Sequence, residues 1–224
     1  MKLIEAANKR KKGSISRWTH YFEAYDFHFE QFQNDPVNLL EIGVMGGGSL
    51  WMWKKYFEKS WIVGLDYNVE CVKWAGEGVK VCIGDQADIV RLRQIHYEDG
   101  PFDIIIDDGS HKMLDQQLTF NTLFPLMNDG GVYVIEDLHT SFWPPWLEDG
   151  VERTLLRLLR HAEGLQGWAK RSHEARELVE DGSAGYFEQN ISSMHFYDSI
   201  CFIYKNGHGQ NNLEKSKGEC IYHG

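Results

Sequence analysis

Between residues 37 and 138 the chain alternates short apolar runs with longer segments whose apolar residues recur at helical spacing. The short runs predict β-strands and the longer segments predict helices, because side chains repeat every two residues in a strand and about every 3.6 in a helix. The expected strands cover residues 37–44, 61–66, 79–85, 102–108 and 130–138, and the expected helices cover 49–59, 69–75, 87–97 and 112–127. This alternation predicts a doubly wound α/β fold, with a mostly parallel sheet and helices on both of its faces.

A helix is also expected before the first strand, within residues 14–32, with Ser14 or Ser16 as its N-terminal cap. One face of this helix carries a stripe of aromatic side chains, namely Trp18, Tyr21, Phe22, Tyr25, Phe29 and Phe32. Such a stripe packs into the core or against a second subunit, and Tyr21 could in addition line a site. From this stripe we expect the protein to form a homo-oligomer.

The last third of the chain has a different pattern. Residues 146–165 predict a further helix, and residues 191–207 predict two strands with a short connection. An antiparallel hairpin would therefore close the parallel sheet and bring it to seven strands. We divide the chain into an N-terminal helical segment (residues 1–36), one α/β domain (residues 37–207) and a polar tail (residues 208–224).

Composition restricts the classes of partner. The 224 residues carry a net charge of −10, which argues against binding to nucleic acid or to a membrane surface. The sequence contains no run of about 18 apolar residues, so no membrane span is expected. The four cysteines form no C-x-x-C pair and are interpreted as reduced thiols, which favours a cytoplasmic protein. A small-molecule partner is compatible with all of these observations.

Glycine or acidic residues follow each of the five expected parallel strands. Ligands bind at the carboxyl ends of the strands in open α/β sheets, so these residues are the candidate site. Glycines at 43 and 46–48 let the backbone pass close to a ligand, although they could also form a tight turn and nothing more. Asp66 lies 23 residues after Gly43, near the spacing at which an acid reaches a ribose. Since neither G-x-G-x-x-G nor G-K-[ST] is present, a nucleoside is indicated and a pyrophosphate is not required.

Acids after the fourth and fifth strands form a candidate metal site. Asp108 and Glu136 are 28 residues apart in sequence, but the ends of adjacent strands lie only about 4.8 Å apart. Carboxylates this close, with Asp137 beside them, repel one another unless they are protonated or bind a cation, and oxygen ligands suit Mg²⁺. Neighbouring strand residues face opposite ways, so we assign Asp108 to the ion and Asp107 to a cap or to the cofactor. The alternative is that these acids only cap helices.

His111 begins the helix after the fourth strand, three residues beyond Asp108. A helix N-terminus disfavours imidazolium, so the ring should stay neutral and able to accept a proton. We therefore predict His111 as a general base, with a structural role in the turn as the alternative. His139, Thr140 and Trp143 follow the fifth strand and could contact an acceptor or lie in a solvent-facing loop.

Several of these motifs together resemble a known family. The stretches "EIGV", "GGGS", "GLD", "GDQ", "DDGSH" and "IEDLHTS" are similar to the cofactor and metal motifs of class I S-adenosylmethionine-dependent methyltransferases. The nearer resemblance is to the metal-dependent sugar O-methyltransferases of macrolide biosynthesis, the mycinamicin and macrocin type, and to related proteins named for cephalosporin hydroxylation. It is dense over residues 38–146 and returns in the C-terminal hairpin, and it implies a Rossmann-like methyltransferase domain over residues 37–207.

The resemblance implies a role for each matching residue. S-adenosylmethionine would be bound by Glu41, Gly43, Gly47, Ser49, Asp66, Asp85, Gln86 and Asp107. In that set Gly43, Gly47 and Ser49 would contact its methionine part, Asp66 its ribose, and Asp85 and Gln86 its adenine. Mg²⁺ would be held by Asp108, Glu136 and Asp137, and His111 would be the general base. Met45 stands where the broad class has its second glycine, which bears on the path of the turn.

The predicted function is methyl transfer from S-adenosylmethionine to a hydroxyl group of a small molecule, a sugar or a glycoside. Mg²⁺ would acidify that hydroxyl, and His111 would take its proton. One alternative is a metal-dependent oxygenase of the cephalosporin hydroxylase type, in which His111 and two acids bind iron. The presence of only one histidine in the cluster weakens that alternative. A second alternative is a non-catalytic module that binds the cofactor, against which the intact acid–histidine set argues.

Overall fold

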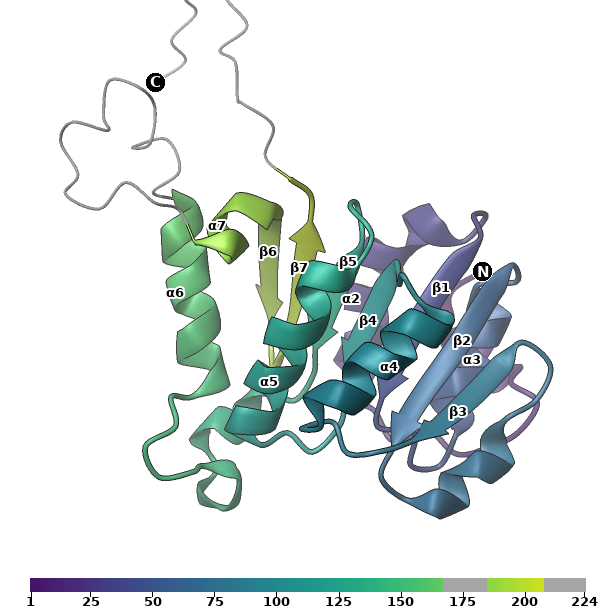
Figure 1. The fold of residues 1–224 in the computed structure, drawn as a ribbon. Helices are drawn as coiled ribbons and strands as arrows, with labels where there is room; N and C mark the ends of the chain where they lie inside the picture. The colour runs from purple at the N-terminus through teal and green to yellow at the C-terminus, as the bar shows by residue number, and fades with distance from the viewer. Residues whose placement is uncertain (167–184, 208–224) are drawn as a thin grey trace, which may run out of the picture.

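Seven strands form one sheet in the order β3-β2-β1-β4-β5-β7-β6 (Figure 1). The strands are β1 Val37–Ile42, β2 Ser60–Asp66, β3 Val79–Ile83, β4 Ile104–Asp107, β5 Val132–Ile135, β6 Ile191–Tyr197 and β7 Ile200–Lys205. Strands β1 to β5 pair in parallel, whereas β7 runs antiparallel to both β5 and β6. The doubly wound sheet with a C-terminal antiparallel hairpin is therefore confirmed. The computed structural model describes residues 1–166 and 185–207, so the predicted polar tail lies outside the described residues.

Helices cover both faces of the sheet, as the alternating pattern predicts (Figure 1). The α-helices are α1 Leu3–Asn8, α2 Thr19–Phe29, α3 Gly48–Tyr56, α4 Ile89–Asp99, α5 Met113–Leu123, α6 Thr154–Gln166 and α7 Tyr186–Asn190. Short 3₁₀ helices are η1 Glu30–Phe32, η2 Val69–Trp74, η3 Phe124–Leu126, η4 Leu138–Phe142 and η5 Pro144–Trp146. Along β2, Ile62 packs into the core shared with α1, α2 and α3, and Val63 packs into the core shared with α4, α5 and α6. This change of side at each residue is the strand periodicity that the sequence shows.

The aromatic stripe before β1 is mostly part of the core. Tyr21, Tyr25 and Phe29 on α2 have no exposed surface, and the Tyr25 ring lies 5.2 Å from that of Phe202 on β7. The expected serine cap is wrong, because α2 begins at Thr19 and no side chain caps it. Since α1 and α2 share a core with α3, the N-terminal segment is packed on the sheet, and the domain boundary at residue 36 stays a prediction.

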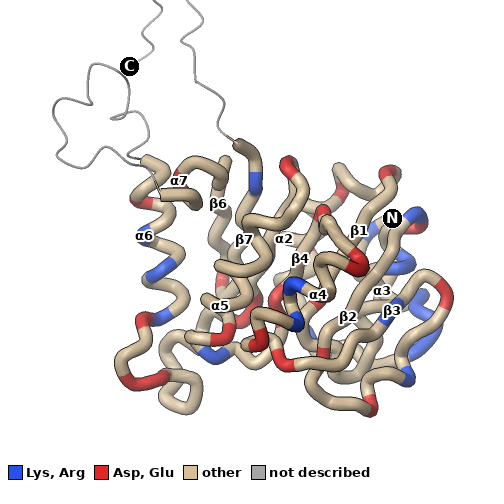
Figure 2. The backbone as a smooth tube through the Cα atoms, in the orientation of Figure 1, with Lys and Arg blue, Asp and Glu red and all other residues tan. Residues whose placement is uncertain are grey.

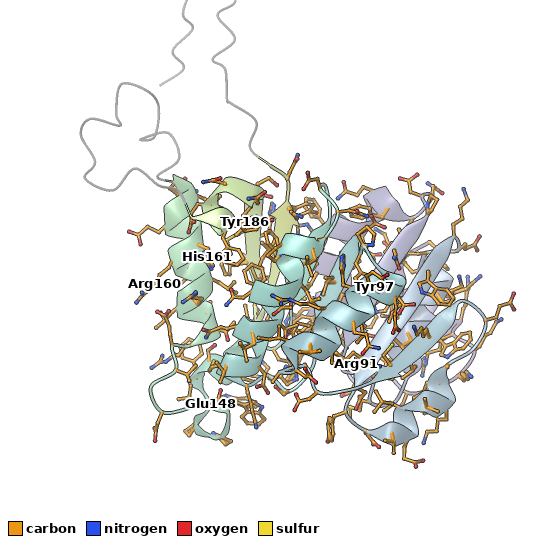
Figure 3. The ribbon with its side chains drawn as sticks, viewed as in Figure 1. Arg91, Tyr97, Glu148, Arg160, His161 and Tyr186 are labelled. Carbon is orange, nitrogen blue, oxygen red and sulfur yellow. The ribbon has the colours of Figure 1, made fainter. Side chains whose placement is uncertain are left out.

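The helix expected over residues 146–165 begins eight residues late, at Thr154. Gly150 in the preceding turn has φ +77°, a left-handed conformation that does not continue a helix. Further along, His161 of α6 lies 3.4 Å from Glu188 of α7, which brings these two helices together at the edge of the fold (Figure 3). Among the described residues, no helix combines the length and apolarity needed to cross a bilayer.

The carboxyl ends of the parallel strands meet at one edge of the sheet. Ile42 at the end of β1 pairs with Leu65 on one side and Asp107 on the other, and Asp107 pairs with Ile135. Figure 2 shows acidic segments along this lower edge, where β2 and β4 end. The residues that follow the strands, which carry the predicted chemistry, are therefore neighbours in space.

Candidate active site

The ends of β1, β2 and β4, together with residues 14–17, enclose a cavity of about 960 Å³. This volume lies within the range of small-molecule sites. Of the predicted site residues, those that line the cavity are Gly43, Ser49, Asp66, Asp85, Gln86, Asp108, His111 and Asp137. The other four, Glu41, Gly47, Asp107 and Glu136, are not part of its lining.

The glycine turn after β1 forms one wall of the cavity. Gly43 has φ +92°, and a Cβ at this position would lie 1.9 Å from the carbonyl oxygen of Asp108, so only glycine fits. Met45 has φ +44°, the left-handed conformation that glycine usually adopts, so the turn follows this path without a glycine here. Its side chain is 77% exposed. Gly47 has φ +70°, and a Cβ there would overlap the Trp74 ring. It therefore shapes the turn without lining the cavity.

Asp66, at the end of β2, holds this turn in place. One oxygen of its carboxylate accepts hydrogen bonds from the amides of Val44 and Met45, each at 2.9 Å. The other oxygen accepts a hydrogen bond from the Asn68 amide at 2.8 Å. A carboxylate has about four acceptor positions, so this one can still bind the hydroxyl groups of a ribose in the cavity.

Asp107, the last residue of β4, and Asp108, the residue after it, point to opposite sides of the backbone. Asp107 is fully buried and accepts hydrogen bonds from Gln86 at 3.3 Å and from Tyr133 at 3.5 Å. Burial raises the pKa of Asp107 to about 7. Gln86 in turn accepts a hydrogen bond of 2.6 Å from the Ser110 amide. Asp107 therefore orients a residue of the cavity wall, whereas Asp108 lines the cavity itself.

Three side chains at the ends of β4 and β5 come close enough to hold one metal ion. Ligand atoms of Asp108, His111 and Asp137 all lie within 4.8 Å of one another. His111 Nε2 is 3.6 Å from Asp137 Oδ2 and 3.9 Å from Asp108 Oδ1. Tyr21 donates a hydrogen bond of 2.8 Å to Asp137, so one residue of the aromatic stripe does reach the site. Glu136, the remaining predicted metal ligand, is not a member of this group.

Glu136 and Glu41 instead bind Arg17, a functional residue that the sequence pattern does not single out. The Arg17 side chain is 1% exposed, and its Nη2 lies 2.9 Å from Glu41, 3.0 Å from Asp108 and 2.8 Å from Glu136. Tyr25 donates a short hydrogen bond to Glu136. These partners are between 24 and 119 residues from Arg17, and no local spacing rule connects them. A basic residue directly before the aromatic stripe is the only signal in the sequence.

The acids around Arg17 carry more negative charge than one guanidinium balances. Burial, followed by the nearby Glu136, raises the pKa of Asp108 well above its usual range, although Arg17 opposes the shift. Burial also raises the pKa of Glu136, again against the effect of Arg17. A divalent cation beside Asp108 would favour its ionised form, so a donor set that includes Asp108 and Asp137 fits such an ion. One histidine with two carboxylates is the reverse of the two-histidine, one-carboxylate set of iron oxygenases.

His111 lines the cavity beside two of the acids. Burial lowers the pKa of its ring, an effect that exceeds the opposing influence of Asp137, so the ring is neutral at pH 7. The main cause is thus burial rather than the helix N-terminus, since α5 begins two residues later, at Met113. Within the described residues, Nδ1 is buried without a hydrogen-bond partner, while Nε2 faces the two acids. The side chain is therefore placed in the cavity rather than in the turn.

A row of aromatic rings borders the acid–histidine group. The His139 ring lies 6.1 Å from that of Trp18 and 4.5 Å from that of Trp143, which is 5.5 Å from Trp146. Trp18 is 54% exposed and Trp143 is 46% exposed. The row reaches the site because Trp18 directly precedes α2 and His139 follows Asp137 by two residues. These rings are not part of the cavity lining, but His139 is close enough to contribute to the lowered pKa of His111.

The fold and this site together define a Rossmann-like protein with a nucleoside-sized cavity and an acid–histidine group at the strand ends. Residues 45–182 match the family described as a methyltransferase domain. The chain is 36% identical over 216 residues to demethylmacrocin O-methyltransferase of Streptomyces fradiae, covering 87% of this chain and 50% of that protein. It is also 36% identical over 205 residues to mycinamicin VI 2''-O-methyltransferase of Micromonospora griseorubida, covering 83% and 48%. The chain belongs to the methyltransferase family.

A solved structure agrees with this assignment. The MycE methyltransferase of mycinamycin biosynthesis, in complex with Mg and S-adenosylhomocysteine, has a TM-score of 0.81 and 32% sequence identity to this chain. The match covers 96% of this chain and 57% of MycE. The resemblance to macrolide sugar O-methyltransferases is confirmed, and the chain spans about half the length of the curated relatives it matches.

Proposed function

We propose that this chain transfers a methyl group from S-adenosylmethionine to a hydroxyl group of a sugar or glycoside, with the help of Mg²⁺. One observation carries the proposal: a single cavity joins the glycine turn and Asp66 to the group formed by Asp108, His111 and Asp137. A methyl donor and a hydroxyl acceptor would therefore meet inside one site. The names of the relatives, and the Mg and S-adenosylhomocysteine of MycE, support the same chemistry.

For the cofactor, we propose that Gly43 and Ser49 contact the methionine part and Asp66 the ribose. Ser49 lines the cavity and donates a hydrogen bond of 2.7 Å to the buried Glu41, which thus acts behind the cavity surface. Asp85 and Gln86 are proposed to lie by the adenine, since both line the cavity after β3. Asp107 and Gly47 would support Gln86 and the turn without direct contact.

For the metal, we propose Asp108 and Asp137 as ligands, from the two strand ends that face the cavity. Glu136 stays a predicted third ligand, and it would have to share its carboxylate with Arg17 and Tyr25. The ion would supply Lewis-acid polarisation of the acceptor hydroxyl, which makes its proton easier to remove.

The proton and methyl transfers follow from the position of His111. Its Nε2 accepts the proton of the acceptor hydroxyl, and Asp137 at 3.6 Å stabilises the imidazolium that forms. The acceptor oxygen forms a bond to the methyl carbon while the carbon–sulfur bond of the donor breaks. The electron pair of that bond stays on sulfur, so the products are the methyl ether and S-adenosylhomocysteine.

The aromatic row beside the site supports a sugar as the acceptor. The exposed rings of Trp18 and Trp143 suit the apolar C–H face of a pyranose, while the acids suit its hydroxyl groups. A ring with vicinal hydroxyls would thus be held from two sides.

The proposal is tested by calorimetry and by turnover. We expect the protein to bind S-adenosylhomocysteine in the calorimeter. We also expect it to convert S-adenosylmethionine to S-adenosylhomocysteine when Mg²⁺ and a probe acceptor, demethylmacrocin or mycinamicin VI, are added. Absence of any S-adenosylhomocysteine binding would overturn the proposal. Iron-dependent oxygen consumption with the same acceptors would favour the oxygenase alternative, and cofactor binding without turnover of either probe would favour the non-catalytic module.

We propose a homo-oligomer, although the aromatic stripe that suggested it is largely buried within this chain. We also propose the cytoplasm as its compartment, a proposal supported by Cys71, Cys82 and Cys201, which are buried and unpaired.

A further inference from the structure

Residues 13–17, which we call the N-terminal strap, connect α1 to the segment before α2 and form part of the cavity wall. The Ser14 amide donates a hydrogen bond of 3.0 Å to the Gly46 carbonyl, and the Gly48 amide donates one of 3.1 Å to the Ser14 carbonyl. Gly13 has φ +84°, and a Cβ there would lie 2.5 Å from the Gly48 nitrogen. The strap therefore packs backbone against backbone on the glycine turn.

These two hydrogen bonds are a weak anchor by themselves. Ser14 and Ser16 are exposed to solvent, and a typical hydrogen bond contributes only about 0.5–1.5 kcal/mol to a folded state. The strong anchor is at the other end of the strap. There the buried Arg17 guanidinium pairs with acids from the ends of β1, β4 and β5.

The two ends of the strap cannot move independently. Three residue steps separate Ser14 from Arg17, a reach of at most about 11 Å for a fully extended chain. Release of the strap from the glycine turn would pull on Arg17. Release of Arg17 would leave the buried Glu41 and Glu136 carboxylates, and the partly exposed Asp108, without their guanidinium. Removing one partner of a buried ion pair is strongly destabilising, so the acids hold the whole strap in place.

We propose that Arg17 is a positioning residue for the cofactor: its ion pairs hold the strap against the glycine turn and complete the wall of the cofactor cavity. The inference rests on the proposed function, in that this cavity is taken to bind S-adenosylmethionine. Arg17 acts here through Ser14 and the turn, not through the metal. Loss of its guanidinium should loosen the strap and weaken cofactor binding without any divalent ion present.

The first test uses hydrogen exchange on the ligand-free protein, in peptides covering residues 13–17 and 43–49. In Arg17→Met we expect these amides to exchange at least about tenfold faster than in wild type. In Arg17→Lys, which keeps the positive charge but loses the planar guanidinium and its several N–H donors, the increase should be smaller. The matched control is Lys12→Met, at an exposed position beside the strap, whose Nζ donates a hydrogen bond to the Ala75 carbonyl and lies over the Trp51 ring. In this control variant, the amides of residues 13–17 and 43–49 should exchange at the wild-type rate. Unchanged exchange in both Arg17 variants would overturn the proposal.

The second test measures S-adenosylhomocysteine binding by calorimetry in the presence of EDTA. We expect about a tenfold weaker affinity in Arg17→Met, equivalent to about 1.4 kcal/mol, an intermediate value in Arg17→Lys, and no change in Lys12→Met. Gly13→Ala breaks the strap at its other end and leaves the ion pairs alone, so it should weaken binding as well. If Arg17→Met does not fold, Arg17→Lys and Gly13→Ala carry the test.

The outcomes separate this inference from the proposed function. If the wild-type protein binds no S-adenosylhomocysteine, the proposed function fails, and hydrogen exchange still decides whether Arg17 holds the strap. If the Arg17 variants bind as tightly as wild type, only the role of Arg17 fails. A loss of affinity with unchanged strap exchange would show that Arg17 contacts the ligand directly, which also overturns the positioning role.

Discussion

His111 Nε2 lies 3.6 Å from Asp137 Oδ2, although the two residues are 26 positions apart and follow different strands. Both adopt a left-handed backbone, with φ +58° at His111 and φ +55° at Asp137. Such conformations are uncommon for residues other than glycine, and they cluster at functional sites. Here they aim an imidazole and a carboxylate at each other across the ends of β4 and β5.

His111→Gln tests the proposed base. We expect the rate of methyl transfer to fall by about 10²–10⁴-fold, because a positioned proton acceptor contributes that much, while binding of S-adenosylhomocysteine stays unchanged. Initial rates and calorimetry measure the two effects. His20→Gln is the control, since His20 is exposed and bonds the Asp198 carbonyl outside the cavity. Equal rates for His111→Gln and wild type would exclude His111 as the base.

Asp137→Asn and Glu136→Gln separate the two acids after β5. Asp137 belongs to the group within 4.8 Å, whereas Glu136 is bound to Arg17 and Tyr25. We expect Asp137→Asn to weaken Mg²⁺ binding at least tenfold, and Glu136→Gln to weaken it by much less. Calorimetric titration with Mg²⁺ on both variants decides between them. An equal loss in Glu136→Gln would establish Glu136 as a ligand.

Gly43→Ala should destabilise the protein and abolish cofactor binding. The new Cβ would lie 1.9 Å from the Asp108 carbonyl, at a residue with φ +92°. Gly130→Ala is the matched control, because Gly130 has φ +84° with nothing within 4 Å of its Cβ position. That variant should lose only about 1–2 kcal/mol of its free energy of unfolding, the cost of holding an alanine in a left-handed conformation. Thermal unfolding of both proteins measures the difference, and similar losses would argue against the close contact.

His28 should make the folded state sensitive to mild acid. Burial, with a smaller effect of His195, lowers the pKa of His28 to about 4, and its two ring nitrogens lie at 2.8 Å from the Tyr204 hydroxyl and 3.0 Å from that of Tyr197. The unfolded chain has a histidine pKa of about 6.5 and so binds the proton first as the pH falls. The contribution of His28 to stability is therefore full above about pH 6.5 and declines toward pH 4.

The measurement for His28 is urea unfolding at pH 7.5 and at pH 5. Wild type should lose more of its free energy of unfolding between these values than His28→Gln does, because the variant has no titrating group at this position. The comparison is between slopes, so a uniform loss of stability in the variant does not affect it. Parallel pH dependences in the two proteins would contradict the prediction.

Most of the sheet could be predicted because its evidence is local. Apolar runs such as residues 102–108 mark a strand without reference to the rest of the chain, and alternation with helices determines a parallel sheet. The errors fall at the ends of elements. Residues 146–153 carry helix-like spacing, but the left-handed Gly150 keeps them out of α6. Ser14 looks like a helix cap but belongs to the strap, because its backbone pairs with Gly46 and Gly48.

The candidate site was likewise predictable where its evidence is local, and not where it depends on distant segments of the chain. The sequence by itself determined that glycines and acids stand at the carboxyl ends of parallel strands, because that follows from the order of strands and helices along the chain. Only the tertiary structure decided which side chains meet. It turns Glu136 and Glu41 toward Arg17 and joins His111 to Asp108 and Asp137, since those contacts depend on where α2 and the strap lie. Strand periodicity predicts on which side of a strand a carboxylate lies. It does not predict which charged side chain from a distant segment will lie next to that carboxylate.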